Sequence, residues 1–273
     1  RADVKSYDLD LGDGTKISLT SGNPVGNYYT HNYSAPGAYK VQVTVKFTNR
    51  ADLFTEYWDT VYARPVVNWV LTSFDSQCFK GNNYIFQDQS IQAPQPSNPI
   101  AGRYWVWGDG SEENMVTPGS NTINHVYPIA GRRNSVTLRV TDQLGCQNSQ
   151  QKFIYVAPDL GAKFRVSGVP RCDTTPYIFV NQSSVAIGNV GWFRWDFGDG
   201  TIYQSRNPPV PADIAYWNSF THNYIKGGVF APKLTIKHKS FNCIDSFDYN
   251  LSGEQLPENI IVLYDIRSRR TMQ

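Results

Sequence analysis

The sequence predicts an all-β chain built from tandem β-sandwiches, and three observations support this prediction. Apolar residues alternate with polar residues over short stretches, as they do in strands with one buried face. Turn-forming glycine, proline, asparagine and aspartate separate these stretches. A linked pattern of residues also recurs three times, about 90 residues apart. Many short strands with turn signals between them favour sandwiches over a parallel sheet covered by helices.

The composition of the 273-residue chain excludes several classes of protein. Charged residues make up 18% of the chain, and 25 lysines and arginines nearly balance 23 aspartates and glutamates. Nucleic-acid binding needs a basic surface, so we expect no nucleic-acid partner. The hydrophobic fraction of 40% excludes wholesale disorder. No apolar run is long enough to cross a bilayer, so we expect no membrane span in this segment.

The recurring pattern divides the chain into three repeats. Each repeat has Gly-Asp-Gly followed by serine or threonine, then His-x-Tyr, then a glycine four residues after the tyrosine. Self-similarity at a fixed spacing is typical of tandem modules. The triplets are Gly12-Asp13-Gly14, Gly108-Asp109-Gly110 and Gly198-Asp199-Gly200, and the ring pairs are His31 and Tyr33, His125 and Tyr127, and His222 and Tyr224.

A strand leads into each Gly-Asp-Gly triplet, with large apolar residues at alternate positions. These are Leu9 and Leu11, Trp105 and Trp107, and Trp195 and Phe197. Side chains two residues apart in a strand lie on the same side of the sheet, so we expect these columns to face the cores. A second alternating strand follows each His-x-Tyr. In the third repeat Pro232 interrupts it, which a central strand disfavours.

Clusters of alanine and proline indicate the module boundaries. We predict modules over residues 1–65, 66–158 and 159–253, with a C-terminal extension or the start of a further module over 254–273. The linkers between them are very short, which predicts an extended, semi-rigid array. Only eleven residues precede Gly12. The first module is therefore expected to be N-terminally incomplete, and the chain to be an excerpt of a longer protein.

The third repeat carries the fullest motif, Trp195-Asp196-Phe197-Gly198-Asp199-Gly200-Thr201 followed by Thr221-His222-Asn223-Tyr224. This motif resembles that of the PKD (polycystic kidney disease) domain family, and the three repeats extend the resemblance over nearly the whole chain. The second repeat departs at Val106 and Trp107, and the first at Leu9 and Leu11, but the core positions stay apolar. The resemblance implies immunoglobulin-like β-sandwiches used as extracellular spacers or interaction modules. It implies no single activity.

Four cysteines allow three disulfide connectivities. Cys78 and Cys146 bracket the triplet of the second repeat, and Cys172 and Cys243 bracket that of the third, so the repeat favours these two pairs. The paired positions look like those of PKD repeats in long bacterial surface proteins, including gliding-motility and adhesion proteins (adhesins) exported by the type IX secretion pathway. An even, repeat-matched set of cysteines indicates an oxidising compartment, so we expect an extracellular or cell-surface location.

The histidines and the motif inventory argue against catalysis. His31, His125 and His222 occupy one repeat position, which favours a structural role in the turn, and His238 is expected at the surface. The sequence has no Gly-x-Ser-x-Gly, His-Glu-x-x-His, Cys-x-x-Cys, Gly-x-Gly-x-x-Gly or P-loop motif. We predict that the chain is not an enzyme.

Two groups of residues are candidates for ligand binding. The turn aspartates Asp13, Asp109 and Asp199 could contribute to a calcium site, but turn stabilisation is the favoured role and no cofactor is expected. Aromatic residues outside the core columns could stack on sugar rings; these are Trp58, Trp69, Trp217, Tyr28 and Tyr29. Trp217 and Trp58 are selected as candidate ligand contacts, Trp217 because it lies in the long insert over residues 203–220. Packing is the commoner role of tryptophan, and the proline-rich residues 207–211 could instead brace a module junction.

The favoured function is a non-enzymatic, extracellular structural or adhesive segment of a larger cell-surface protein. Its expected partners are other modules of the same long chain and a surface, protein or polysaccharide. The alternative is a carbohydrate-binding accessory region of a secreted hydrolase, a setting in which PKD domains also occur.

Overall fold

The computed structural model describes residues 3–20, 29–116, 121–167, 176–225 and 228–252. The predicted extension over 254–273 and the candidates Cys172 and Tyr28 lie outside these residues. The chain divides into two compact units. Unit 1 comprises Arg1–Asp75, Asn83–Val126 and Arg133–Ile154, and unit 2 comprises Ser76–Asn82, Tyr127–Arg132 and Tyr155–Gln273. No helix among the described residues has the length and apolar character needed to cross a membrane.

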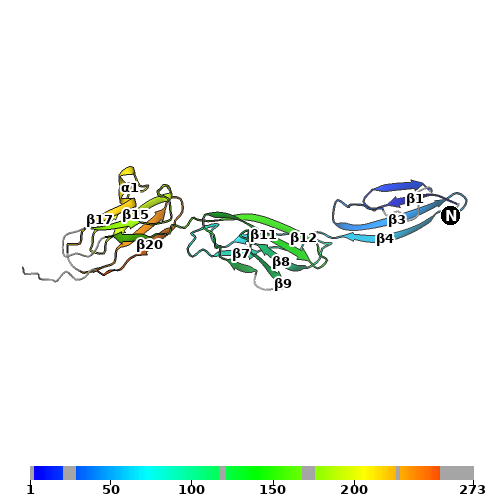
Figure 1. Ribbon diagram of the computed structural model, residues 1–273. Coiled ribbons are helices and arrows are strands. Elements are labelled where there is room, and N and C mark those ends of the chain that lie inside the picture. The colour runs from blue at the N-terminus through cyan, green and yellow to red at the C-terminus, as the bar shows by residue number, and fades with distance from the viewer. Residues whose placement is uncertain (1–2, 21–28, 117–120, 168–175, 226–227, 253–273) are drawn as a thin grey trace, which may run out of the picture. The chain divides into compact units, whose positions relative to one another are not determined.

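The first repeat forms one antiparallel sheet of four strands in the order β2-β1-β3-β4 (Figure 1). β1 leads into the Gly-Asp-Gly turn, β2 follows it, and β3 and β4 form a long hairpin. The strands are β1 (Val4–Asp10), β2 (Lys16–Thr20), β3 (Gly37–Phe47) and β4 (Leu53–Val61). None of the apolar side chains in these four strands is buried, whereas Leu11, directly after β1, is 5% exposed.

The second repeat forms a three-stranded sheet, β10-β7-β5, and a five-stranded sheet, β6-β12-β11-β8-β9. Their strands are β5 (Trp69–Leu71), β6 (Ser76–Gln77), β7 (Tyr84–Asp88), β8 (Ile100–Val106), β9 (Glu112–Val116), β10 (Thr122–His125), β11 (Arg132–Asp142) and β12 (Gln147–Val156). The aromatic column of β8 faces the smaller sheet, and Trp105 contacts Trp69 and Phe86 at ring separations of 5.7 and 5.6 Å. Two sheets with rings interleaved between them make a β-sandwich.

The third repeat repeats this arrangement with sheets β13-β14-β17 and β16-β15-β19-β20 and a two-stranded sheet of β18 and β21. The elements are β13 (Phe164–Ser167), β14 (Tyr177–Asn181), η1 (Ile187–Asn189), β15 (Val190–Asp196), β16 (Ile202–Gln204), α1 (Pro211–Asn218), β17 (Ser219–His222), β18 (Val229–Phe230), β19 (Lys233–His238), β20 (Ile244–Asp248) and β21 (Leu251–Ser252). Trp195 and Phe197 are fully buried between the sheets. Pro232 separates β18 from β19, since proline has no N–H to donate to the sheet.

The strands and sheets confirm the predicted all-β fold class. The inward columns are also confirmed in the second and third repeats, where Trp105, Trp107, Trp195 and Phe197 are at most 1% exposed. The predicted module boundaries are not tested by the strand pairing and stay a prediction.

The predicted cysteine pairing is wrong: Cys78 bonds to Cys243, with a Cα–Cα distance of 5.4 Å, and Cys146 is a free thiol. The register of β12 explains why. Ser76 and Gln77 pair with Tyr155 and Val156 at the end of β12, so Cys78 follows the C-terminal end of that strand. Cys146 directly precedes its first residue. A ten-residue strand is roughly 30 Å long, too far for a disulfide.

Candidate functional site

The Gly-Asp-Gly turns have the same internal bonding in all three repeats. One oxygen of each aspartate accepts a backbone N–H two residues on, at 2.9 Å, from Thr15, Ser111 or Thr201. The other oxygen lies 2.7–2.8 Å from Nε2 of the histidine in the same repeat. The histidine of the His-x-Tyr pair therefore bonds to the aspartate of the Gly-Asp-Gly triplet. The two parts of the recurring sequence pattern are thus in direct contact in the folded protein.

In the second and third repeats the ring of the histidine also stacks on the aromatic residue that directly precedes the Gly-Asp-Gly triplet. His125 stacks on Trp107 with ring centroids 4.5 Å apart, and His222 stacks on Phe197 at 4.2 Å. The tyrosine two residues after the histidine bonds to the backbone just before the triplet in the first and third repeats. Tyr33 donates its hydroxyl to the carbonyl of Leu11 at 3.0 Å, and Tyr224 donates to that of Phe197 at 2.9 Å.

The bonds lower the pKa of the turn aspartates. At Asp13 the N–H of Thr15 and then His31 bring the pKa to about 2. At Asp199 burial alone would raise the pKa, but the bonds from Thr201 and His222 outweigh it and lower the pKa. At Asp109 burial is likewise outweighed, by the bonds from Ser111 and His125. The aspartates thus act as charged acceptors within the fold.

His238 is buried, with 5% of its area exposed, and the predicted surface position is therefore wrong. Its Nδ1 accepts the N–H groups of Ser240 and Phe241 at 3.0 and 3.2 Å. Burial and then the nearby Lys239 lower the pKa of the imidazole. The neutral ring is therefore the form that fits the turn between β19 and β20.

Acidification is expected to destabilise the fold in two steps. A lowered pKa in the folded state stabilises the protein above the unfolded pKa and loses that contribution as the pH falls. For His238 the loss begins below about pH 6.5, and for the turn aspartates below about pH 4. Urea unfolding at pH 7.5, 5.5 and 3.5 measures both steps. His238→Asn should remove the first step only, and a stability that rises between pH 7.5 and 5.5 would contradict the assignment.

Replacing His222 by alanine is expected to lower the free energy of unfolding of unit 2 by about 1–3 kcal/mol, since Asp199 loses its partner and Phe197 loses a stacked ring. Asn223→Ala is the matched control, because this exposed neighbour should change stability by no more than about 0.5 kcal/mol. Thermal and urea melts measure both variants. Unchanged melts together with lost ligand binding would instead assign His222 to a binding site.

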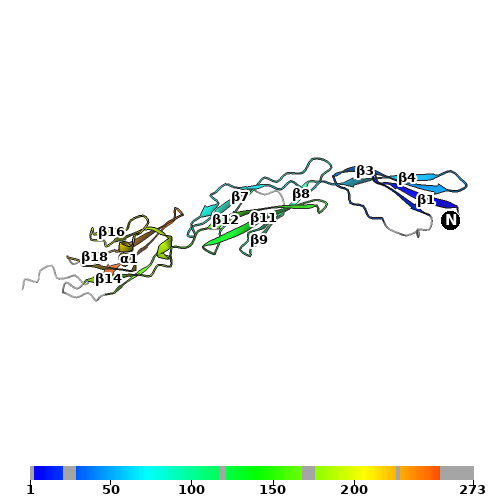
Figure 2. The ribbon, with the colours of Figure 1, turned by 90° about the horizontal axis from the view of Figure 1, so that it is seen from above.

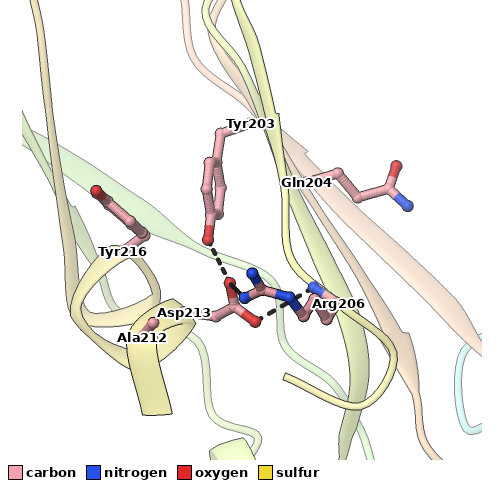
Figure 3. Close-up of a pocket in the computed structure, with 6 residues that line it drawn as sticks. All are labelled: Tyr203, Gln204, Arg206, Ala212, Asp213 and Tyr216. Carbon is pink, nitrogen blue, oxygen red and sulfur yellow. Dashed lines mark hydrogen bonds and ion pairs between the residues drawn. The ribbon is translucent and has the colours of Figure 1, made fainter. Parts of the chain in front are cut away.

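The insert of the third repeat forms α1 and, beside it, a pocket of about 400 Å³ (Figure 3). Its lining consists of Tyr203, Gln204, Arg206, Ala212, Asp213 and Tyr216. Tyr203 and Tyr216 lie with ring centroids 4.7 Å apart, and Gln204 points away from the two rings. The pocket thus combines two tyrosine rings with the guanidinium group of Arg206 and the carboxylate of Asp213.

Asp213 organises this pocket from within the first turn of α1. Its carboxylate accepts the hydroxyl of Tyr203 at 2.6 Å and the N–H of Val210 at 2.9 Å, and it pairs with Arg206 at 3.4 Å. The bond from Tyr203 and that from Val210 lower the pKa of Asp213. Burial, together with Asp213, raises the pKa of Tyr203 to about 12, so Tyr203 stays a hydrogen-bond donor. The acid fixes the start of the helix and the position of one pocket ring.

The structure corrects two of the candidate aromatic contacts. Trp217 is 7% exposed and packs on Phe193 at 5.3 Å, so α1 turns it into the core instead of presenting it to a ligand. Trp69 is fully buried because β5 lies opposite the aromatic column of β8. Trp58, on β4, is 62% exposed and Tyr29 is 51% exposed. Sequence reasoning misses Tyr203 and Tyr216, although both lie in the insert that it selects.

Trp217→Ala is expected to cost about 3–5 kcal/mol of folding stability, because it removes a large ring from the core of the third repeat. Tyr216→Ala, at the exposed neighbouring position, is the control and should cost much less. Urea unfolding followed by tryptophan fluorescence compares the two. Equal losses would show that Trp217 does not anchor α1.

No group of three or more potential metal ligands occurs among the described residues. Both oxygens of each turn aspartate are engaged by the histidine and a backbone N–H. These bonds support the turn-stabilising role. Calcium binding at the turns stays an untested alternative.

No family model matches the chain, and no curated protein matches it. Two solved PKD domains are similar to this chain. The PKD1 domain of the Vibrio cholerae metalloprotease PrtV is 23% identical over 35% of this chain and 99% of that domain, with a TM-score of 0.28. The PKD1 domain of Vibrio anguillarum Epp is 20% identical over 36% of this chain and 99% of that domain, also with a TM-score of 0.28.

A structure described as a carbohydrate-binding module of the β-sandwich superfamily is 16% identical over 73% of this chain and 87% of its own length, with a TM-score of 0.31. These TM-scores are too low to establish a shared fold. The fold assignment for this protein therefore depends on its own strand pairing and ring packing.

Proposed function

We propose that the chain is a non-enzymatic, extracellular segment of PKD-like modules from a larger cell-surface protein, and that it mediates adhesion or contact with proteins or surfaces. The observation that carries this proposal is the triple Asp–His turn. In each repeat the histidine bonds to the aspartate, and the aspartate accepts a backbone N–H, so the most reactive side chains of the motif support the fold. The Cys78–Cys243 disulfide supports an oxidising compartment.

Small-angle scattering combined with an adhesion assay tests this proposal. An extended array should give a radius of gyration well above the roughly 18–19 Å expected for a compact globule of this length. Beads coated with the protein should be retained on cell or polysaccharide surfaces under flow more strongly than beads coated with the urea-unfolded, alkylated chain. A globular radius, equal retention of both bead types, or turnover in a hydrolase substrate panel would count against the proposal.

The alternative, a carbohydrate-binding accessory region, is favoured by the pocket beside α1. Two tyrosine rings with the guanidinium group of Arg206 in the same pocket are groups that can contact a sugar ring and its hydroxyls. A glycan array followed by calorimetry tests it with Tyr216→Ala and, as a control, Tyr62→Ala at another exposed position. A glycan that binds the native protein and the Tyr62 variant, but not the Tyr216 variant, would support the alternative.

A further inference from the structure

The pocket beside α1 is built by an insert that the second repeat lacks. The connection from β16 to β17 holds residues 205–218, including α1, whereas the corresponding connection from β9 to β10 holds only residues 117–121. Figure 2 shows α1 beside the strands of the third repeat. Both repeats form the Asp–His turn, so the longer connection is not needed for the shared fold. Longer loops on a rigid scaffold are common places for binding residues.

The carboxylate of Asp213 is occupied by groups of the protein itself. Its Oδ1 accepts the hydroxyl of Tyr203 at 2.6 Å and lies 3.4 Å from Nη1 of Arg206. Its Oδ2 accepts the N–H of Val210 at 2.9 Å and that of Arg206 at 3.3 Å. These contacts fill the roughly four acceptor positions of a carboxylate, and the side chain is only 5% exposed. Asp213 therefore supports the pocket instead of accepting hydrogen bonds from a ligand.

The guanidinium of Arg206 is the exposed partner of this ion pair. Its side chain is 67% exposed, and its contact with Asp213 is a long one at 3.4 Å (Figure 3). A guanidinium has several N–H donors in one plane, so donors remain for a ligand. Tyr203 adds no negative charge, because its pKa is raised to about 12. A ligand that enters the pocket thus meets the cation, while the anion lies buried beneath it.

Tyr216 supplies an aromatic ring that is held in place before any ligand binds. Its carbonyl accepts the Nε1–H of Trp195 at 2.9 Å, which ties the end of α1 to the core. The centroid of its ring lies 4.7 Å from that of Tyr203 and 5.1 Å from that of Phe220. Tyr216 is nevertheless 44% exposed. A ring fixed in this way loses little conformational freedom when a flat, partly apolar ligand packs on it.

We propose that this pocket binds a uronic-acid unit of an acidic polysaccharide. The apolar face of the sugar ring packs on Tyr216, and the carboxylate of the sugar accepts two parallel N–H groups from Arg206. The planar guanidinium matches a carboxylate in this bidentate arrangement, and a neutral sugar offers no such partner. The volume of about 400 Å³ is typical of sites for small ligands or single units of a longer chain.

The inference rests on the carbohydrate-binding alternative above and narrows it to one class of sugar. A short oligomer of galacturonic acid and its methyl ester are the probes, because esterification removes the negative charge and keeps the sugar ring. Calorimetry with the full 273-residue protein should show that the acid form binds at least about tenfold more tightly than the ester. This preference should shrink at high salt, because salt screens an exposed ion pair.

Arg206→Gln should bring the affinity for the acid form down to that for the ester. The variant should fold, because Asp213 keeps its bonds to Tyr203, to Val210 and to the backbone N–H of residue 206, and a thermal melt checks this. Arg165→Gln is the matched control. Arg165 is an exposed arginine on β13 of the same unit, so its replacement changes the net charge equally and should leave the preference for the acid form unchanged.

The outcomes separate this inference from the function on which it rests. Tyr216→Ala should weaken binding of the acid and of the ester alike, because it removes the stacking ring from both complexes. Equal affinity for acid and ester, a preference that survives Arg206→Gln, or one that Arg165→Gln abolishes would overturn the uronic-acid assignment while carbohydrate binding stands. Tighter binding of a sulfated oligomer of a neutral sugar would overturn it too. If neither probe nor any neutral glycan binds, the inference and the carbohydrate-binding alternative both fail.

Discussion

Reduction of the Cys78–Cys243 disulfide is expected to produce a large loss of stability in unit 2. The bond closes a loop with a sequence separation of 165, which on the chain-entropy model corresponds to roughly 5 kcal/mol of stabilisation. Urea unfolding with and without a reducing agent measures the difference. Cys78→Ser should reproduce the effect of reduction, whereas Cys146→Ser should not, because Cys146 is free.

Other contacts at the disulfide persist after reduction, so unit 2 should weaken without losing its native pairing. Lys80 pairs with Asp245 at 2.6 Å, and the same carboxylate accepts the N–H of Ala162 at 2.8 Å. Tyr155 stacks on Phe241 at 5.3 Å. Peptide mapping under non-reducing conditions checks the connectivity directly. A Cys78–Cys146 peptide would refute the pairing and restore the one that the repeat spacing favours.

Gly108→Ala is expected to be the most damaging single substitution in the Gly-Asp-Gly turns. Gly108 has φ +82°, and a Cβ there would lie 2.6 Å from the carbonyl oxygen of Ser135 and 2.7 Å from its nitrogen. Backbone atoms cannot move aside as a flexible side chain can, so the two strands must separate. We expect a loss above about 4 kcal/mol, the range of exceptional point mutations.

Gly110→Ala provides the matched comparison two residues away. Gly110 also has a positive φ, +102°, but a Cβ at this position would have no described atom within 4 Å. Its substitution should therefore cost only backbone strain, about 1–3 kcal/mol. Urea melts of both variants, or soluble yield where Gly108→Ala does not fold, give the comparison. Equal losses would show that close approach of Ser135 is not what requires glycine.

The features that the sequence predicts best are those that depend on local geometry. Alternation of large apolar residues places Trp105, Trp107, Trp195 and Phe197 inward, because a strand fixes which side each residue faces. The repeated position of the histidine indicates a turn residue for a similar reason. Its partner, the motif aspartate, is not predictable in this way, since the loop between them varies in length among the repeats.

Features that depend on contacts distant in sequence are harder to predict. Repeat spacing favours one cysteine pairing, but spacing says nothing about the length of β12 between Cys146 and the position of Cys78. The insert that contains Trp217 carries no clear helical pattern, so the helix that turns this residue inward is not evident from the sequence. The buried position of His238 depends on backbone N–H groups from the turn that follows it, which its ring accepts.

The Cys78–Cys243 bond also decides how the chain carries tension. A pull applied at the two ends of residues 1–273 passes from Cys78 to Cys243 through the two sulfurs, because this covalent route is the shortest one. The residues between these cysteines form a loop closed by the disulfide, and the covalent route that transmits the applied force does not pass through them. Both the Asp–His turn of the second repeat and that of the third lie within the loop. In an oxidising medium these two turns are thus shielded from stretching, while the turn of the first repeat is not.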